Sequence, residues 1–129
     1  MENESYEKGI ATLHRLMGGT RGLEEMGEVA PELSRLAIEA VGDIYNNDAL
    51  DTRTRELATV AALTALANAR PQLKAHIFGA LSAGCTRGEI VAVITQMYAY
   101  AGFPAALNGM DAAREVFEEI GDTEFQAGR

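Results

Sequence analysis

The 129-residue sequence has a single cysteine, no tryptophan and few aromatic residues, and such shortages exclude certain kinds of site. One cysteine excludes an intramolecular disulfide and any site built from several thiolates. The two histidines, His14 and His76, lie too far apart in the chain to suggest a pair of metal ligands. The sequence therefore predicts neither a metal site nor a disulfide framework.

Basic residues are also scarce. Eleven lysines and arginines face nineteen aspartates and glutamates, which gives a formal net charge of −8. A partner with a phosphate backbone is not expected, because nucleic-acid binding depends on clustered Lys and Arg. The longest apolar stretch, Leu57 to Ala69, includes polar residues and is too short to span a bilayer, and the first residues lack the basic region of a signal peptide. We therefore expect a soluble protein in the reducing cytoplasm, without a membrane partner.

Alanine, leucine, valine and isoleucine dominate the apolar residues, and they recur at helical spacing almost throughout. This pattern predicts an all-α, single-domain bundle of about six helices over residues 1–121, followed by a polar tail at 122–129. One predicted apolar helix face follows Pro31 and comprises Leu33, Leu36, Ala37, Ala40, Val41, Ile44 and Tyr45. A second predicted inward face comprises Leu57, Val60, Ala61, Thr64 and Ala67.

Two local signals mark the boundary between the helix that Pro71 opens and the next one. Gly84 suits the left-handed position at which a helix ends. Thr86-Arg87-Gly88-Glu89 has the spacing of a capping box, in which the first and last side chains satisfy backbone donors of the new helix.

The order of motifs over residues 51–106 resembles the carboxymuconolactone decarboxylase family. It reads Asp-x-Arg-x-Arg-Glu-Leu, an alanine-rich helix, Leu-x-x-His-x-x-x-Ala-Leu-x-x-Gly-x-Thr-x-x-Glu-Ile, and then Tyr-x-Gly-x-Pro-Ala-Ala. The resemblance extends over roughly residues 6–120. It implies an alkylhydroperoxidase D-like helical subunit that assembles into a ring-like homo-oligomer, a trimer or hexamer. It also implies one of two chemistries, cofactor-free decarboxylation or thiol-based reduction of hydroperoxides.

The thiol-based branch of the family uses a Cys-x-x-Cys pair just before the family histidine. Counting back from His76, those places hold Ala69 and Gln72, so the redox couple is missing. Cys85 could still react as a lone thiol with an external thiol, in the manner of a peroxidase or disulfide reductase. The competing interpretation, which we favour, is that Cys85 is a small residue filling a turn.

The decarboxylase branch needs no cysteine. The substrate that the resemblance implies is a small carboxylated lactone, whose conjugated carbonyl receives the electron pair when CO2 leaves, so no cofactor is required. His76 is then the candidate proton donor, because histidine titrates near neutral pH. The alternative for His76 is a structural histidine, bonded to a backbone carbonyl or to a neighbouring subunit.

Four further residues complete the predicted site. Glu56 matches the position of a proton-relay glutamate in the thiol branch, and could orient His76 or be a solvated acid in the first turn of its helix. Arg53 and Arg55 could bind substrate carboxylates, or could pair at the surface with Asp51 or Glu56. Tyr100 could donate its hydroxyl to the substrate.

One segment departs from the family pattern. Residues 41–51 lack the tryptophans and the Arg-Pro-Gly-Leu-Asp sequence of characteristic decarboxylases, which points to a different substrate. A third function class therefore stays open beside the two enzymes, a non-catalytic oligomeric binding protein that keeps the fold.

Overall fold

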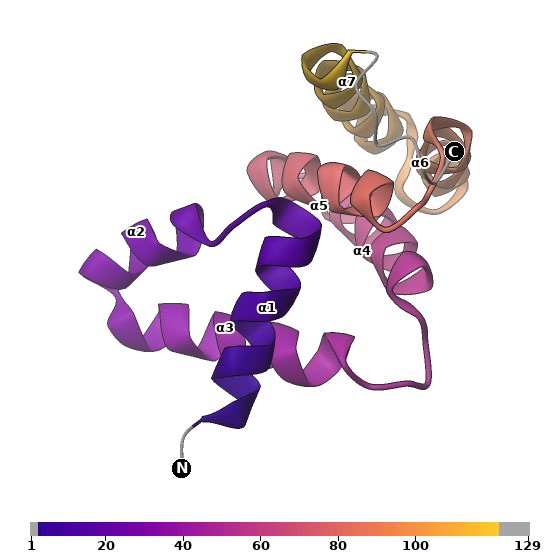
Figure 1. Ribbon diagram of the computed structural model, residues 1–129. Coiled ribbons are helices and arrows are strands. Elements are labelled where there is room, and N and C mark those ends of the chain that lie inside the picture. Colours follow the sequence, from indigo (N-terminus) through magenta and orange to yellow (C-terminus); the bar gives the residue numbers. More distant parts are fainter. Residues whose placement is uncertain (1–2, 122–129) are drawn as a thin grey trace. The chain divides into compact units, whose positions relative to one another are not determined.

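A computed structural model describes residues 3–121, and this part of the chain contains seven α-helices and no strand (Figure 1). The all-α class predicted from the sequence is confirmed. The helices are α1 (Glu4–Met17), α2 (Arg21–Val29), α3 (Pro31–Tyr45), α4 (Thr52–Leu66), α5 (Arg70–Ser82), α6 (Arg87–Ala101) and α7 (Phe103–Ile120). The seventh helix, relative to the expected six or so, is α2, which contains Gly22 and Gly27 and has no buried residue.

The helices group into two compact units, with α1 to α3 within residues 1–51 and α4 to α7 from residue 52 onward. The single domain over residues 1–121 stays a prediction, and the predicted tail at 122–129 lies outside the described residues. No helix in residues 3–121 is both long and apolar enough to cross a membrane.

In the first unit, α1 and α3 approach each other through two glycines. A Cβ atom added to Gly9 would lie 1.9 Å from the carbonyl oxygen of Ile38, and one added to Gly42 would lie 2.0 Å from that of Ser5. Real Cβ atoms are never this close to backbone atoms, so only glycine permits the contact.

This close contact corrects the predicted face of α3. The buried residues of α3 are Ser34, Ile38 and Gly42, whereas Leu33 and Leu36 of the predicted face are 57% and 50% exposed. Helix backbones can approach this closely only where a glycine lies at the contact, so the face that contains Gly42 packs against α1. Ile38 is buried there, while Leu33, Leu36 and Ile44 stay on the surface of this unit.

In the second unit, α4 to α7 enclose a continuous apolar core. It comprises Val60, Leu73, Ile77, Ala80, Leu81, Cys85, Ile90, Ile94, Ala112, Ala113 and Val116. The buried residues of α4 are Glu56, Val60 and Thr64, which lie one helical turn apart along one face. The predicted inward face is confirmed for Val60 and Thr64, whereas Leu57 is only partly buried and Ala67 is exposed beyond the end of the helix.

The two local signals around residue 85 are confirmed. Gly84 has φ 102°, and the Cys85 and Gly84 N–H groups donate to the carbonyls of Ala80 and Leu81, closing α5 in a Schellman motif. The Thr86 hydroxyl accepts from the Glu89 N–H at 3.0 Å, and the Glu89 carboxylate accepts from the Thr86 N–H at 2.9 Å.

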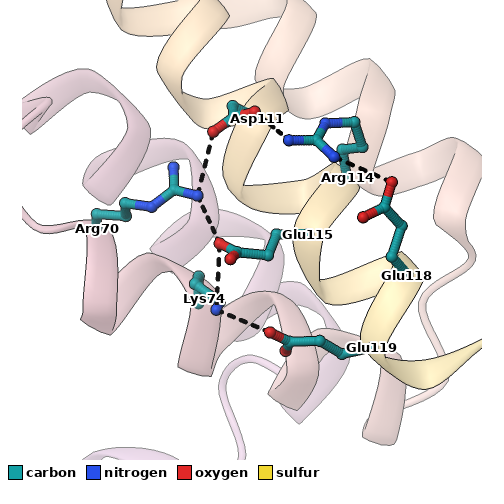
Figure 2. A network of polar contacts seen from close by, with 7 residues as sticks. All are labelled: Arg70, Lys74, Asp111, Arg114, Glu115, Glu118 and Glu119. Carbon is teal, nitrogen blue, oxygen red and sulfur yellow. Dashed lines mark hydrogen bonds and ion pairs between the residues drawn. The ribbon is translucent and has the colours of Figure 1, made fainter.

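A network of ion pairs joins α5 to α7 on the surface of the second unit (Figure 2). Arg70 contacts Asp111 at 3.1 Å and Glu115 at 2.6 Å, and Lys74 contacts Glu115 at 3.2 Å and Glu119 at 3.1 Å. Within α7, Arg114 contacts Asp111 at 2.6 Å and Glu118 at 3.0 Å.

This network predicts a loss of stability in acid. The side-chain hydrogen bond from Arg70, followed by that from Lys74, lowers the pKa of Glu115, and the hydrogen bond from Arg114 does the same for the pKa of Asp111. A carboxyl group with a lowered folded-state pKa stabilises the fold fully above its unfolded pKa, and this contribution disappears as the pH falls through the folded value. We therefore expect the midpoint temperature of thermal unfolding to decrease once the pH is lowered below about 4.5, the ordinary range of carboxyl pKa values. Circular dichroism melts from pH 7 to pH 2 measure it.

Glu115→Gln provides the control for this acid transition. The variant should melt lower than wild type at pH 7 and show a smaller further decline in acid, because one of the titrating groups is gone. Equal pH dependence in the two proteins would contradict a contribution from this network.

Candidate active site

Glu56 is a carboxyl group placed entirely inside the second unit. It lies in the second turn of α4, on the face that Val60 and Thr64 continue, and its side chain has no solvent exposure. Burying an ionisable side chain is costly unless a partner compensates for the lost water. The alternative prediction for Glu56, a solvated acid in the first turn, is therefore wrong.

His76 is the partner. It projects from α5, and its Nδ1 atom lies 2.9 Å from Oε1 of Glu56. The other carboxylate oxygen, Oε2, has no hydrogen-bond partner among the described residues. The imidazole is thus the one group in residues 3–121 that compensates this buried carboxyl, and it is itself 26% exposed.

The bond fixes which nitrogen of His76 is available. A carboxylate can only accept hydrogen bonds. When Glu56 is ionised, Nδ1 therefore carries the proton and donates the hydrogen bond to Oε1. Nε2 is then the ring nitrogen that the Glu56 hydrogen bond leaves available. Such an arrangement is typical of a histidine acid–base group oriented by a carboxylate.

Arg53 lies in the first turn of α4 and forms an ion pair with Glu89 of α6. The sequence suggested Asp51 or Glu56 as surface partners and did not anticipate Glu89. The sequence did contain a signal for this ion pair, because a capping box engages only one carboxylate oxygen of Glu89 and leaves the second for a cation.

Cys85 is fully buried in the core of the second unit. It occupies the position after Gly84 in the Schellman motif, where an apolar residue commonly packs against the last turn of the helix. Its Sγ lies 3.7 Å from the carbonyl oxygen of Arg53. This environment is that of a small residue filling a turn.

The other two predicted site residues, Arg55 and Tyr100, take no part in the Glu56–His76 hydrogen bond. Arg55 is partly buried on α4, where its carbonyl oxygen accepts the Thr59 hydroxyl at 2.9 Å. Tyr100 is 78% exposed near the end of α6, about 16 Å along the helix axis from Glu89. Tyr98, on the same helix, is 58% exposed and packs edge-on against Phe103.

Surface hollows lie elsewhere on the second unit. One, of about 580 Å³, runs between α5 and α7 and is lined by Pro71, Lys74, Ala75, Phe78, Val116, Glu119 and Ile120. Neither Glu56 nor His76 lines it, and it holds no histidine or cysteine. Among the described residues, no group of three or more histidine, cysteine or acidic side chains is placed to hold a metal ion. The Glu56–His76 pair is therefore the candidate site on chemical grounds.

Comparison with known proteins gives a consistent family assignment. The model of the carboxymuconolactone decarboxylase family matches residues 31–115, a range that includes the Glu56–His76 pair. The chain is 27% identical to 4-carboxymuconolactone decarboxylase of Acinetobacter baylyi (strain ATCC 33305 / BD413 / ADP1) over 124 residues, covering 93% of this chain and 92% of that protein. It is 39% identical over 79 residues to an uncharacterized 15.0 kDa protein in the nqo9-nqo10 intergenic region of Paracoccus denitrificans, covering 60% of this chain and 59% of that protein.

Proposed function

The chain belongs to the carboxymuconolactone decarboxylase family, and from this premise we propose that it releases CO2 from a small carboxylated lactone or a related acid. The observation that carries the proposal is the 2.9 Å contact between His76 Nδ1 and the fully buried Glu56. This contact provides an oriented acid–base group without a metal ligand or a second thiol.

In the proposed reaction, the bond between the ring carbon and the departing carboxylate breaks. Its electron pair passes through the conjugated double bond to the carbonyl oxygen and forms a dienolate. His76, in its imidazolium form, then donates the Nε2 proton to carbon, and water restores that proton before the next turnover. Each turnover therefore consumes one proton and releases one CO2.

Glu56 acts through His76 in this scheme. Its Oε1 accepts a hydrogen bond from Nδ1–H, which keeps the ring in one orientation and stabilises the positive charge that the imidazolium carries. Because the carboxylate is buried, little water competes for this bond. We propose Arg55 and Tyr100 as substrate contacts, and a homo-oligomer as the active form. The exposed apolar side chains of Tyr98, Phe103 and Leu107 support an oligomer.

The proposed activity is tested with γ-carboxymuconolactone, by following CO2 release together with the loss of ultraviolet absorbance. We expect turnover by the wild type and by Cys85→Ser, because no step involves the thiol. A second assay offers a hydroperoxide with an external dithiol, for which we expect no activity above background, since the Cys85 thiol is buried.

The outcomes distinguish the three function classes. Peroxide reduction that disappears in Cys85→Ser would replace the decarboxylase by the thiol enzyme. No turnover in either assay would overturn the proposal for this substrate. If lactones or dicarboxylates also failed to raise the melting temperature, the non-catalytic binding protein would be favoured.

A further inference from the structure

The first turn of α4 contacts both the turn after α5 and the first turn of α6. The Arg53 side chain forms the ion pair with Glu89, and the Arg53 carbonyl oxygen lies 3.7 Å from Cys85 Sγ. Arg53 precedes Glu56 by three residues, which is just under one helical turn. Cys85 lies in the turn that directly follows α5, the helix that carries His76, and Glu89 lies in the first turn of α6.

The capping box with Thr86 orients the Glu89 side chain independently of Arg53. Its Oε1 accepts the Thr86 N–H at 2.9 Å, while its own N–H donates to the Thr86 hydroxyl at 3.0 Å. The hydrogen bond from the Thr86 backbone, followed by that from Arg53, lowers the pKa of Glu89. The carboxylate is therefore charged and fixed at neutral pH, and ion pairing has less side-chain entropy left to overcome.

The Glu56 side chain has no comparable support of its own. Its only hydrogen bond among the described residues is the one to His76, and its Oε2 has no partner there. The length and angle of that bond consequently depend on where the backbones of α4 and α5 lie relative to each other. A small slide of the first turn of α4 would lengthen it directly.

We propose that Arg53 and Glu89 are positioning residues, which hold the first turn of α4 so that the Glu56 carboxylate meets Nδ1 of His76. Arg53 then serves the site through Glu89 rather than through a substrate carboxylate. The inference rests on the proposed function only for its effect on turnover, because the Glu56–His76 hydrogen bond can be observed without substrate.

A positioning role differs measurably from a contribution to overall stability. Both partners of the ion pair are about 40% exposed, and pairs at such sites contribute little to the free energy of unfolding. Removal of the pair should therefore leave the melting temperature nearly unchanged and still alter the His76 ring.

The test uses Arg53→Met and Glu89→Gln, with Arg53→Lys as the conservative variant. The amide side chain introduced by Glu89→Gln would keep a carbonyl oxygen for the Thr86 N–H and lose only the charge. The matched control is Glu115→Gln, which removes ion pairs of α7 with α5 and leaves α4 untouched.

The primary readout is the ring proton on His76 Nδ1, followed by ¹⁵N-edited NMR. His14, the other histidine of the chain, is exposed on α1 and serves as an internal reference. In Arg53→Met and Glu89→Gln we expect this proton to exchange with water about tenfold faster than in wild type, as a hydrogen bond weakened by about 1.4 kcal/mol would allow. Arg53→Lys should preserve most of the protection, and Glu115→Gln all of it.

Unchanged exchange in both Arg53→Met and Glu89→Gln would overturn the proposal, as would an equal change in Glu115→Gln. If Glu89→Gln does not fold, Arg53→Met decides alone, since it leaves the capping box intact. A shift of the His76 signal in a protein that releases no CO2 would support the positioning role and separately contradict the proposed reaction.

Discussion

Replacement of His76 by alanine is expected to lower kcat/KM for CO2 release at least about 100-fold, the scale of a lost positioned acid–base group. The imidazole is the only partner of the buried Glu56 among the described residues, so the variant removes the proton donor and its oriented hydrogen bond together. Steady-state kinetics with γ-carboxymuconolactone measure the effect. His14→Ala is the matched control and should retain wild-type activity, because His14 is exposed on α1.

Loss of His76 also leaves a buried carboxyl without its partner, which by itself destabilises a fold by about 1–3 kcal/mol. The kinetics are therefore taken below the melting temperature of the variant, and Glu56→Gln is measured beside it. The amide in Glu56→Gln would keep a hydrogen-bonding group for Nδ1 and lose the charge that stabilises the imidazolium, so its activity should lie between those of wild type and His76→Ala. More than about a tenth of wild-type activity in His76→Ala would exclude His76 as the proton donor.

Replacement of Gly42 by alanine is expected to destabilise the protein by about 3 kcal/mol or more, the upper end for an overpacked contact. The added Cβ would lie 2.0 Å from the carbonyl oxygen of Ser5 and 2.7 Å from the Gly9 nitrogen. Both obstacles are backbone atoms, so α1 and α3 must move apart for the methyl group to fit. Urea unfolding followed by circular dichroism gives the change in the free energy of unfolding.

Gly22→Ala is the matched control for this prediction. Gly22 lies within α2, and a Cβ added there meets no atom within 4 Å. This variant should be stabilised by about 0.5–1 kcal/mol, because alanine favours the helix more than glycine does. A cost below about 1 kcal/mol for Gly42→Ala would mean that the α1–α3 contact adapts easily.

Local signals in the sequence were sufficient where the chain determines its own conformation. Gly84 was predicted to be left-handed and the segment Thr86 to Glu89 to form a capping box, and both were found. Each depends on hydrogen bonds between residues a few positions apart, which sequence spacing encodes directly. The helical period likewise predicted the all-α class.

Predictions that depended on which face of a helix meets another were less accurate. Leu33 and Leu36 belong to the predicted apolar face of α3, yet the buried face follows Ser34, Ile38 and Gly42. Hydrophobic periodicity ranks faces by apolar content, whereas the approach of α1 and α3 is decided by the space between two backbones. That space depends on glycines far apart in the sequence, which no local pattern relates to each other.

The sequence by itself determined the all-α class, the helix end at Gly84, the cap from Thr86 to Glu89, and two candidates, His76 and Glu56, for one site. Only the tertiary structure decided that Glu56 is fully buried and meets Nδ1 of His76, and that Arg53 pairs with Glu89. The physical reason is distance along the chain. Caps and turns join residues within a few positions, while these pairs join side chains 20 and 36 positions apart, whose meeting depends on how α4, α5 and α6 pack.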